Sequence, residues 1–515
     1  SGSGMAAGAV GPSIVVDMSR FTTIAAVDTV AGRVRGGCGA LRGDIDSAAR
    51  QVGFRFPVDP SSGAFCTIGG MAGTNAAGAR SLRYGATRAW TSGLQCVFDD
   101  GSNAWIRRGE SPPTAVPAVQ RLLATLDALD RHGSSAAFAH SGVRKESSGY
   151  AIEAASDGAT NVSDARTSPG DAGSRLVDLL VGSEGTLAFF TEVELALTPA
   201  AGETATVLAV FSSLEAATAC AIDARDAGAS ACELLDRTFL DVAASDGASG
   251  PSAGFATSIS AGAEAVLLCE VEGANRLEAS WLADTFARTC RSHGATDVIT
   301  AVDRRAEHGL WALRHAASPI LARLAPRLRS MQFIEDGCVP PDRFPDYVRG
   351  VRAALARSDT HGVIFGHAGD AHAHVNPLID VTRAGWRERM RGLLDDVCEL
   401  TSRLGGTLAG EHGDGRLRAP LLSRVWSTEA LAAFANVKAA GDPANVFNPG
   451  CKLARPGDDG LASIRYDPEV PPLDPRARAA LDLVEKDRAW QRFRLELAGD
   501  AAVSTPGTAA GLGKP

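Results

Sequence analysis

The sequence predicts an α+β fold with an antiparallel sheet, and three observations carry this prediction. Residues 203–228 run from an apolar strand-like stretch into a helix-like one, and residues 263–294 repeat that order. The stretch LQCVFDDGSNAWIRR (94–108) is typical of a hairpin, because an Asp-Gly pair separates its two halves. Residues 344–356 and 385–404 have helical periodicity. Strand–helix units of this kind favour an α+β module.

Length and composition limit the classes of protein that fit. The chain has 515 residues, of which 45% are hydrophobic, and this is enough for two or three domains. A formal net charge of −9 argues against nucleic acid or an anionic membrane surface as a partner. No apolar run is long enough for a transmembrane segment. The ten cysteines are scattered without a CxxC pair, so we expect no disulfide framework and a cytoplasmic location.

Other elements follow in chain order. SIVVDMS (13–19) alternates weakly and predicts a strand. A helix is expected from about Leu41, because acidic residues fall in what would be its first turn. Residues 156–173 are polar and predict a surface insertion. The tail predicts one helix (475–497) followed by a disordered end.

A glycine-rich stretch, PVDPSSGAFCTIGGMAGTNAAGARSLRYGATR (57–88), stands out in the first half. Glycine lets the backbone approach a ligand closely, and exposed N–H groups in turns bind anions. Small hydroxyl and amide side chains between the glycines add donors for phosphate oxygens. The alternative is a set of ordinary loops.

A histidine-rich stretch, GHAGDAHAHVN (366–376), raises the question of a metal or substrate site. In a hairpin that turns at Gly369–Asp370, residues 367, 372 and 374 would share one face, because strand side chains alternate. The stretch GGTLAGEHGDGRL (405–417) supplies a further carboxylate and imidazole. The alternative is a surface loop that happens to be rich in histidine.

Taken in order, the motifs DPSS, TIGGMAGTNAAGARSLRYGATR and VGSEGTLAFFTEVEL resemble the FAD-linked oxidase and dehydrogenase superfamily. Its flavin domain is of the vanillyl-alcohol oxidase and p-cresol methylhydroxylase (PCMH) type. The similar branch is that of the D-lactate, glycolate and D-2-hydroxyglutarate dehydrogenases, over residues 1–453. The resemblance implies a PCMH-type FAD-binding domain (1–200) without its first strand–helix–strand unit, a ferredoxin-like substrate or cap domain (201–400), a C-terminal segment that completes the active site (401–455) and a tail (456–515).

The resemblance also implies which residues line FAD. The positions that match the family's flavin motifs are Pro60, Ser61, Thr67, Gly69, Gly70, Thr74, Asn75, Gly78, Ser81, Tyr84, Gly85, Glu184 and Gly185. NVFNPGCKL (445–453) resembles the family's closing motif, and Asn448 would adjoin the flavin end of the pocket. A turn-forming Asn-Pro-Gly sequence is the alternative for Asn448.

IFGHAGDAHAHVN resembles the family motif GHxGDGNxHxN, in which the flanking histidines and a glutamate bind a divalent metal. Here these are His367, His374 and Glu411, and zinc or manganese is expected. His412 matches the residue assigned as the general base, since a neutral imidazole can take the substrate hydroxyl proton. At His372 the family usually has asparagine, so His372 could be a further metal ligand or could replace the asparagine's hydrogen bond to the substrate.

The substrate carboxylate has a predicted partner in WALRHAAS (311–318), which resembles the family stretch with an arginine clamp. Arg314 is that arginine, and bidentate carboxylate binding suits its guanidinium. The alternative is a solvated helix arginine. MQFIEDGCVP carries Glu335 and Asp336 where some members have a lysine, so a dicarboxylate substrate is less easily supported.

Together the resemblance implies oxidation of a small D-2-hydroxyacid to the 2-oxoacid, with hydride passing to FAD. A separate acceptor, which could be a protein, a quinone or oxygen, would take the electrons and could hold the chain at a membrane periphery. A homodimer is compatible with the sequence. The alternatives are a truncated, non-catalytic relative that binds FAD weakly, and a non-redox FAD enzyme of the same superfamily.

Overall fold

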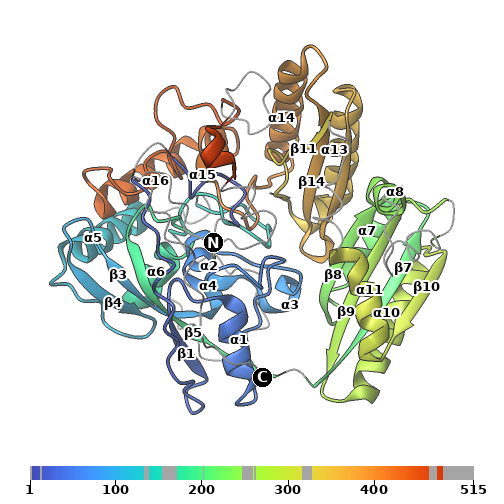
Figure 1. The fold of residues 1–515 in the computed structure, drawn as a ribbon, viewed down its shortest axis with the longest axis horizontal. Coiled ribbons are helices and arrows are strands. Elements are labelled where there is room, and N and C mark those ends of the chain that lie inside the picture. Colours follow the sequence, from blue (N-terminus) through green and yellow to red (C-terminus); the bar gives the residue numbers. More distant parts are fainter. Residues whose placement is uncertain are drawn as a thin grey trace.

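The computed structural model describes residues 3–11, 14–132, 138–152, 171–200, 202–245, 259, 262–315, 327–462 and 473–479. Two sheet-containing units lie beside each other (Figure 1). The C-terminal segment, in orange and red, returns to the unit that contains the N-terminus. The α+β fold class predicted from the sequence is confirmed, and the numerical domain boundaries stay a prediction.

The first unit is built on a four-stranded antiparallel sheet. Its strands, in spatial order, are β1 (Arg33–Gly37), β5 (Phe189–Ala196), β3 (Thr91–Val97) and β4 (Asn103–Arg107). The predicted hairpin is confirmed as β3–β4, which turns at Gly101 with a φ of 79°. The helices that pack on this sheet and on one another are α5 (Pro117–His132), α6 (Ala172–Leu180) and α16 (Thr428–Gly441).

Short elements connect these strands. They are α1 (Arg42–Arg50), α2 (Ile68–Thr74), α3 (Ser81–Tyr84), α4 (Thr87–Trp90) and the small β2–β6 ladder (Phe54–Arg55 with Thr198–Pro199). The helix expected from Leu41 is confirmed, because Leu41 is the N-cap of α1. The strand predicted for 13–19 is wrong over its described residues. They form no ladder with any described segment, and Ile14 is 93% exposed, because no partner covers its apolar side.

The second unit is built on an antiparallel sheet of eight described strands, which confirms the predicted sheet type. The strands are β10 (Asp297–Ala301), β7 (Glu203–Phe211), β9 (Ala265–Gly273), β8 (Ala229–Asp236), β13 (His361–His367), β14 (His372–Asp380) and β11 (Leu328–Ser330), with β12 (Gly337–Cys338) also paired to β14. Because β8 pairs with β13, strands from both halves of this unit form one continuous sheet.

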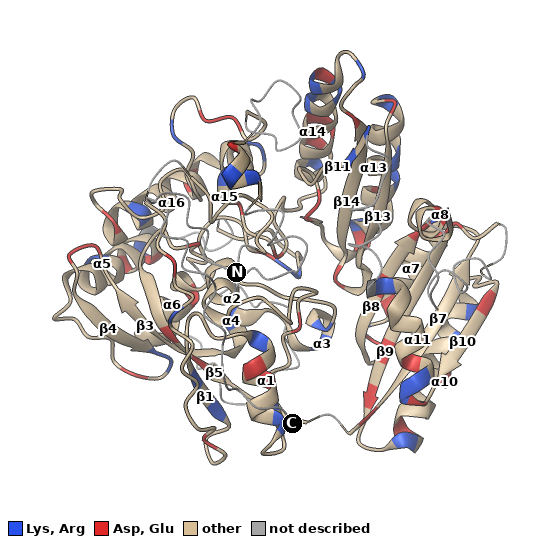
Figure 2. Cartoon of the chain, viewed as in Figure 1, with Lys and Arg blue, Asp and Glu red and all other residues tan. Residues whose placement is uncertain are grey.

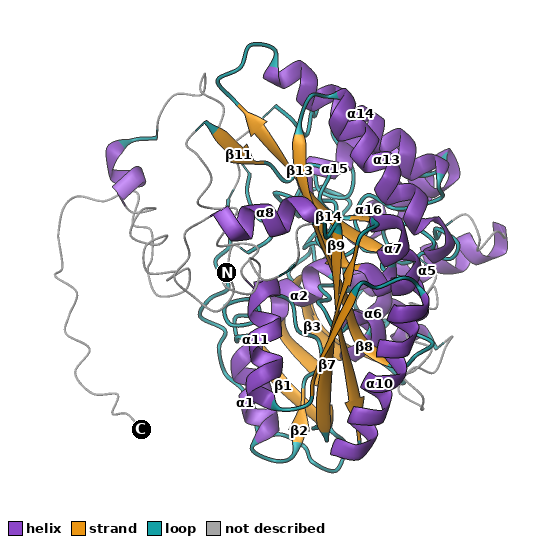
Figure 3. Ribbon diagram, turned by 90° about the vertical axis from the view of Figure 1, so that its right-hand side faces the viewer, coloured by secondary structure: helices purple, strands orange, loops and turns teal. Residues whose placement is uncertain are grey.

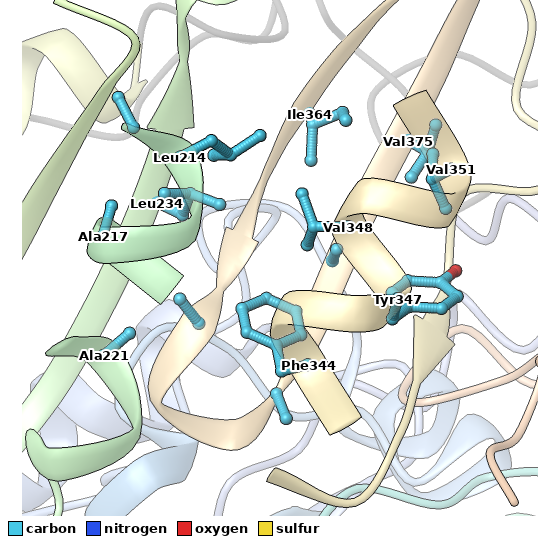
Figure 4. Packing of buried hydrophobic residues seen from close by; sticks show 14 of the residues in the cluster. Leu214, Ala217, Ala221, Leu234, Phe344, Tyr347, Val348, Val351, Ile364 and Val375 are labelled. Carbon is cyan, nitrogen blue, oxygen red and sulfur yellow. The ribbon is translucent and has the colours of Figure 1, made fainter. Parts of the chain in front are cut away.

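Helices cover both faces of this sheet (Figure 3). On one face lie α7 (Leu214–Asp223), α10 (Arg276–Ser292), α13 (Phe344–Arg357) and α14 (Trp386–Arg403). On the other lie α8 (Arg237–Ser245) and α11 (Arg304–His315). Since strand side chains alternate, Ile364 enters the first core and Val363 the second. Figure 4 shows α7 and α13 packing their apolar side chains onto the strands.

The C-terminal segment leaves the second sheet after α14 and packs on the first unit. It continues through α15 (Gly415–Arg418) and the 3-10 helix η4 (Ala419–Arg424) into α16. Trp426, Phe434 and Val437 join the core beneath the first sheet. The loop before α15 therefore runs between the two units.

Three further predictions can be compared with the described residues. No described helix is both long enough and apolar enough to cross a membrane. Both acidic and basic residues lie on α10 and α14 (Figure 2). The expected insertion at 156–173 lies largely outside the described residues, and the described start of the expected tail helix, at 475–479, is helical.

Candidate active site

The three histidines of residues 366–376 lie on one β-hairpin. β13 ends at His367, the 3-10 turn η3 (Ala368–Asp370) follows, and β14 begins at His372. His374 lies two positions further on the same face of β14. All three side chains are buried, and their ring centroids are 4.7 to 5.4 Å apart. The shared face predicted from the sequence is therefore present.

Glu411 reaches this face from the loop between α14 and α15. One of its carboxylate oxygens, Oε1, lies 3.0 Å from His367 Nε2 and 3.3 Å from His374 Nε2. Ligand atoms from His367, His372, His374 and Glu411 all lie within 4.8 Å of one another. A buried set of imidazole nitrogens with a carboxylate oxygen fits zinc or manganese. The structure thus brings the three predicted metal ligands together.

Glu233 is a member of the site that the sequence did not indicate. It lies in β8 directly opposite His367 in the β8–β13 register, and it is fully buried. Its Oε1 lies 2.6 Å from His367 Nδ1. Burial lowers the pKa of His367, but the charge of Glu233 outweighs burial and raises it. Glu233 thereby fixes the orientation of the His367 imidazole through Nδ1, while Nε2 faces Glu411.

Arg314 lies near the end of α11 and contacts the same carboxylate. Its Nε donates to Glu233 Oε2 at 2.6 Å, and its guanidinium lies over the ring of Phe365 at 5.0 Å. Only 8% of Arg314 is exposed, so the alternative of a solvated helix arginine is wrong. Arg314, which is predicted to bind the substrate carboxylate, and His367 therefore both contact Glu233.

Two further carboxylates, Glu335 and Asp336, immediately precede β12 and contact histidines of the cluster. Asp336 accepts hydrogen bonds from the backbone N–H groups of Glu411 and His412, and its Oδ1 lies 2.8 Å from His372 Nε2. Glu335 forms a buried ion pair with Arg418 of α15. These contacts hold the Glu411–His412 loop against the hairpin.

His412 is the most exposed of the clustered histidines, with 21% of its side chain accessible. Its Nδ1 lies 3.1 Å from Glu335 Oε1, and its ring stacks on that of His374 with centroids 5.1 Å apart. Burial opposes the charged form, but the carboxylates, Asp336 first, raise the pKa of His412 to about 9. A role as general base at neutral pH therefore requires that this negative charge be compensated.

Lys145 brings an ammonium group into the cluster from the first unit. Its Nζ donates to Glu411 Oε2 at 2.7 Å, and 3% of its side chain is exposed. Burial raises the pKa of Glu411, but Lys145 and then His367 outweigh burial and hold it well below its usual value. Sequence reasoning missed this residue, because the scarcity of lysine in the chain does not by itself point to a site.

The residues after Lys145 run along the Glu411 loop. Ser147 N donates to Ala409 O at 2.8 Å. Ser148 Oγ and Gly149 N donate to the two carboxylate oxygens of Asp414 at 2.8 and 2.7 Å. This pairing of two loops that are about 265 positions apart in the chain places Lys145 beside the predicted metal ligands.

The glycine-rich stretch forms α2, α3, α4 and the turns between them. A side chain at Gly73 or Gly185 would meet no described atom within 4 Å, and one at Gly70 would meet only Thr67 Oγ1 at 3.1 Å. The backbone at these positions therefore faces space that no described side chain fills. A flavin and its pyrophosphate need such backbone surfaces, so the residues present fit FAD.

Other residues predicted to line FAD are engaged with the protein itself. An added Cβ at Gly78 would lie 2.4 Å from Asp59 O. Asn75 is the left-handed C-cap of α2, and its Oδ1 accepts from Arg88 N at 2.8 Å. Ser81 Oγ donates to Asp370 Oδ2 at 2.6 Å, which ties this stretch to the histidine hairpin. Tyr84 Oη donates to Glu272 of β9 at 2.5 Å.

The remaining predicted FAD residues fall into two places. Pro60, Ser61, Thr67, Gly69, Thr74 and Gly85 lie in the turns and helices of the same stretch. Glu184 and Asn448 meet near the N-terminal segment, where Asn448 Nδ2 donates to Glu184 O at 2.7 Å and to Gly8 O at 2.9 Å. The carboxylate of Glu184 accepts from the backbone N–H groups of Asp414 and Gly415 and lies 3.1 Å from Lys452 Nζ. Contact of all these residues with FAD stays a prediction.

Comparison with known families gives two matches along the chain. Residues 1–107 match the model described as FAD binding domain. Residues 201–451 match the model described as FAD linked oxidases, C-terminal domain. The first match covers β1, β3 and β4 of the first unit, and the second covers the second unit and the C-terminal segment through α16.

Comparison with individual proteins gives curated relatives and structural neighbours. Glycolate oxidase subunit GlcD of Bacillus subtilis is 30% identical over 419 residues, which cover 81% of this chain and 74% of the relative. D-lactate dehydrogenase of Archaeoglobus fulgidus is 27% identical over 87% of this chain and 84% of its own. The chain spans 44% of the length of the D-2-hydroxyglutarate dehydrogenase of Escherichia coli. The structure of 4-ethylphenol oxidase from Gulosibacter chungangensis has the same fold, with a TM-score of 0.56, 11% identity, and coverage of 84% of this chain and 78% of its own.

Proposed function

Because the chain belongs to the family of FAD-linked oxidases, we propose that it oxidises a small D-2-hydroxyacid of the D-lactate or glycolate kind to the 2-oxoacid. The observation that carries the proposal is the buried cluster of His367, His374 and Glu411, with His412 stacked on His374 at its more exposed side. A 2-hydroxyacid carries a hydroxyl oxygen and a carboxylate oxygen on adjacent carbons. A divalent ion held by this cluster would be able to bind both oxygens.

FAD, when bound, supplies the acceptor for the hydride that leaves the substrate carbon. The chain's contribution is to hold the cofactor along the glycine-rich stretch, where Gly70 and Gly73 leave the backbone uncovered, and at Gly185 of the VGSEGT motif. The hydrogen bond from Ser81 to Asp370 fixes that stretch relative to the histidine hairpin. Positioning of this kind lowers the barrier, because reacting groups need not be brought together in the transition state.

A divalent zinc or manganese ion, when bound by His367, His374 and Glu411, supplies Lewis acidity toward the substrate oxygens. Glu233 orients His367 through Nδ1, and Lys145 orients Glu411 through Oε2. Arg314, fixed by Glu233, would bind the substrate carboxylate.

His412 would take the proton of the substrate hydroxyl. It is the most accessible histidine of the cluster, and compensation of the neighbouring carboxylate charge would bring its pKa down from about 9 toward neutrality. Glu335, paired with Arg418, and Asp336 stand where some members of the family have a lysine, so this position offers no lysine for a second substrate carboxylate. A monocarboxylate is therefore favoured over a dicarboxylate.

The electrons would leave to a separate acceptor, which could be a protein, a quinone or oxygen. All ten cysteines are reduced and buried in the structure, which supports a cytoplasmic setting, with contact to a membrane only through the acceptor. A homodimer remains part of the proposal without a surface assigned to it.

Turnover with an artificial electron acceptor tests the proposal. The purified, FAD- and zinc-supplemented protein is assayed with D-lactate, L-lactate, glycolate and D-2-hydroxyglutarate. The proposal expects activity with D-lactate or glycolate, weaker activity with D-2-hydroxyglutarate, none with L-lactate, and a loss of at least about 100-fold in His412→Asn. FAD binding without turnover on any hydroxyacid would instead support a non-catalytic or non-redox relative.

A further inference from the structure

His372 has a different set of contacts from the two histidines that flank it. His367 and His374 both lie within 3.3 Å of Glu411 Oε1, whereas His372 Nε2 lies 2.8 Å from Asp336 Oδ1. His372 is fully buried, with no exposed surface. Among the residues that the structure describes, none forms a hydrogen bond with His372 Nδ1.

The contact with Asp336 determines which nitrogen of His372 carries the proton. Asp336 accepts from the N–H groups of Glu411 and His412, as a carboxylate does. A carboxylate has no proton to donate, so His372 Nε2 must carry the hydrogen and donate it. In the neutral imidazole, Nδ1 then keeps a lone pair that no described hydrogen bond uses.

The remaining surroundings of His372 agree with a ligand role. Gly410 lies against the ring, and an added Cβ there would approach His372 Nε2 to 2.8 Å. The backbone at Gly410 is itself held by a hydrogen bond to Asp336 O at 2.9 Å. The ring is thus fixed on the Nε2 side, and its hydrogen-bonded carboxylate matches the outer partner that metal-binding histidines commonly have.

From these contacts we infer that His372 is a fourth protein ligand of the divalent ion, together with His367, His374 and Glu411. The ligand atoms of these four side chains lie within 4.8 Å of one another. The other role left open by the sequence, a hydrogen bond to the substrate, would need the N–H group that Asp336 already accepts. This inference rests on the proposed function, because the ion is part of that proposal.

Metal preference follows from the ligand set. Three imidazoles and one carboxylate form a nitrogen-rich site, which favours zinc over manganese or magnesium. With four protein ligands instead of three, the ion would keep fewer open positions for substrate oxygens.

A second group of side chains competes for the same ion. Asp336, His374, Glu411 and His412 also have ligand atoms within 4.8 Å of one another. Only His374 and Glu411 belong to both groups. His372 and His412 therefore distinguish the two positions, and each can be replaced by asparagine without a change in net charge for the neutral side chain.

X-ray absorption at the zinc edge tests the inference. The full-length FAD-supplemented protein is stripped with a chelator, loaded with one equivalent of zinc, and the coordinated imidazoles are counted. We expect three in the wild type, two in His372→Asn and three in His412→Asn. Two imidazoles in the wild type, or a count that falls in His412→Asn and not in His372→Asn, would overturn the inference.

Metal affinity gives a second measurement on the same variants. Competition with a chelator should show zinc binding weakened about 10- to 100-fold in His372→Asn, with manganese changed less than about threefold. Equal losses for both metals would contradict the preference. If His372→Asn does not fold, the counts in the wild type and in His412→Asn together still decide, because a third imidazole that survives in His412→Asn cannot come from His412.

Different results would contradict the ligand role of His372 and the proposed function. Three imidazoles with no reduction of the flavin by any hydroxyacid would support the zinc site and contradict the function. Reduction of the flavin by D-lactate, with no zinc bound at one equivalent, would support the redox activity and overturn the ligand role of His372.

Discussion

Lys145 donates a hydrogen bond to Glu411 Oε2 at 2.7 Å, although the two residues are 266 positions apart in the chain. Both side chains are almost fully buried. The ammonium group compensates a carboxylate that would otherwise lie in a low-dielectric interior. It also places a positive charge beside the face at which a cation would bind. Lys145 should therefore stabilise the metal-free protein and weaken the binding of a metal ion.

Replacement of Lys145 by methionine should separate the two effects. Removing one partner of a buried ion pair costs about 3–5 kcal/mol, so the metal-free Lys145→Met protein should melt at a lower temperature than the wild type. Zinc should raise its melting temperature by more than it raises that of the wild type, because the competing charge is gone. Lys145→Arg is the matched control that keeps the charge. A smaller zinc-induced rise in Lys145→Met would show instead that Lys145 is needed to position Glu411.

Replacement of Glu233 by glutamine should weaken the metal site without removing a ligand. Glu233 lies 2.6 Å from both His367 Nδ1 and Arg314 Nε. Loss of the carboxylate leaves His367 less firmly oriented, and such outer partners typically contribute 10- to 100-fold in metal affinity, so about that loss is expected for zinc. Equilibrium competition with a chelator measures it. Glu270→Gln, in the neighbouring strand, is the control, and a loss of similar size there would argue for a general effect on the sheet.

The contact between the two units includes a buried ion pair between Arg55 and Glu272. Arg55 of β2 donates to Glu272 of β9 at 2.6 Å, and Tyr84 donates to the same carboxylate at 2.5 Å. Glu272→Leu should destabilise the protein by about 3–5 kcal/mol, because it leaves Arg55 buried and unpaired. The double variant Arg55→Met/Glu272→Leu should recover most of that loss. Thermal unfolding of the wild type, both single variants and the double variant checks this, and strictly additive losses would contradict it.

Asp236, at the end of β8, predicts a dependence of stability on pH. Burial raises the pKa of Asp236 to about 7, although its Oδ1 accepts from Phe239 N at 2.9 Å. A carboxyl group whose pKa is higher in the folded state favours folding when protonated. Its contribution is therefore lost as the pH rises from the unfolded pKa, about 3.9, through the folded value.

The variant Asp236→Asn keeps the hydrogen-bond acceptor and carries no charge. Its stability relative to the wild type should increase between about pH 4 and pH 7 and then level off, at an advantage on the order of 2–4 kcal/mol. Unfolding in denaturant at several pH values measures the difference. The exposed Asp284→Asn serves as the control, and a pH-independent difference for Asp236→Asn would rule out the proposed titration.

The parts of the fold that the sequence could predict depend on local patterns. α13 and α14 follow apolar periodicity, and their observed ends lie within one residue of those predicted. The histidine hairpin was predictable because its three imidazoles lie within eight positions of one another, so strand alternation alone places them on one face. The strand predicted at 13–19 failed because alternation cannot show whether a partner strand is present.

The parts that could not be predicted depend on pairing between distant segments. Glu233 and His367 are 134 positions apart and meet only through the β8–β13 register. Lys145 meets Glu411 only because residues 147–149 bond to the 409–414 loop. Neither contact leaves a local pattern, since each is set by long-range hydrogen bonding of the backbone. The sequence therefore indicated the ligating atoms of the site but not the charges that surround them.

An absorption spectrum between about 300 and 550 nm, taken before and after anaerobic addition of D-lactate, tests the central claim most directly. The flavin bands of the FAD-supplemented protein should bleach on addition of a productive D-2-hydroxyacid, because hydride transfer reduces the flavin. The same bands should persist with L-lactate. Flavin bands that no D-2-hydroxyacid in the panel bleaches would contradict the proposed reaction.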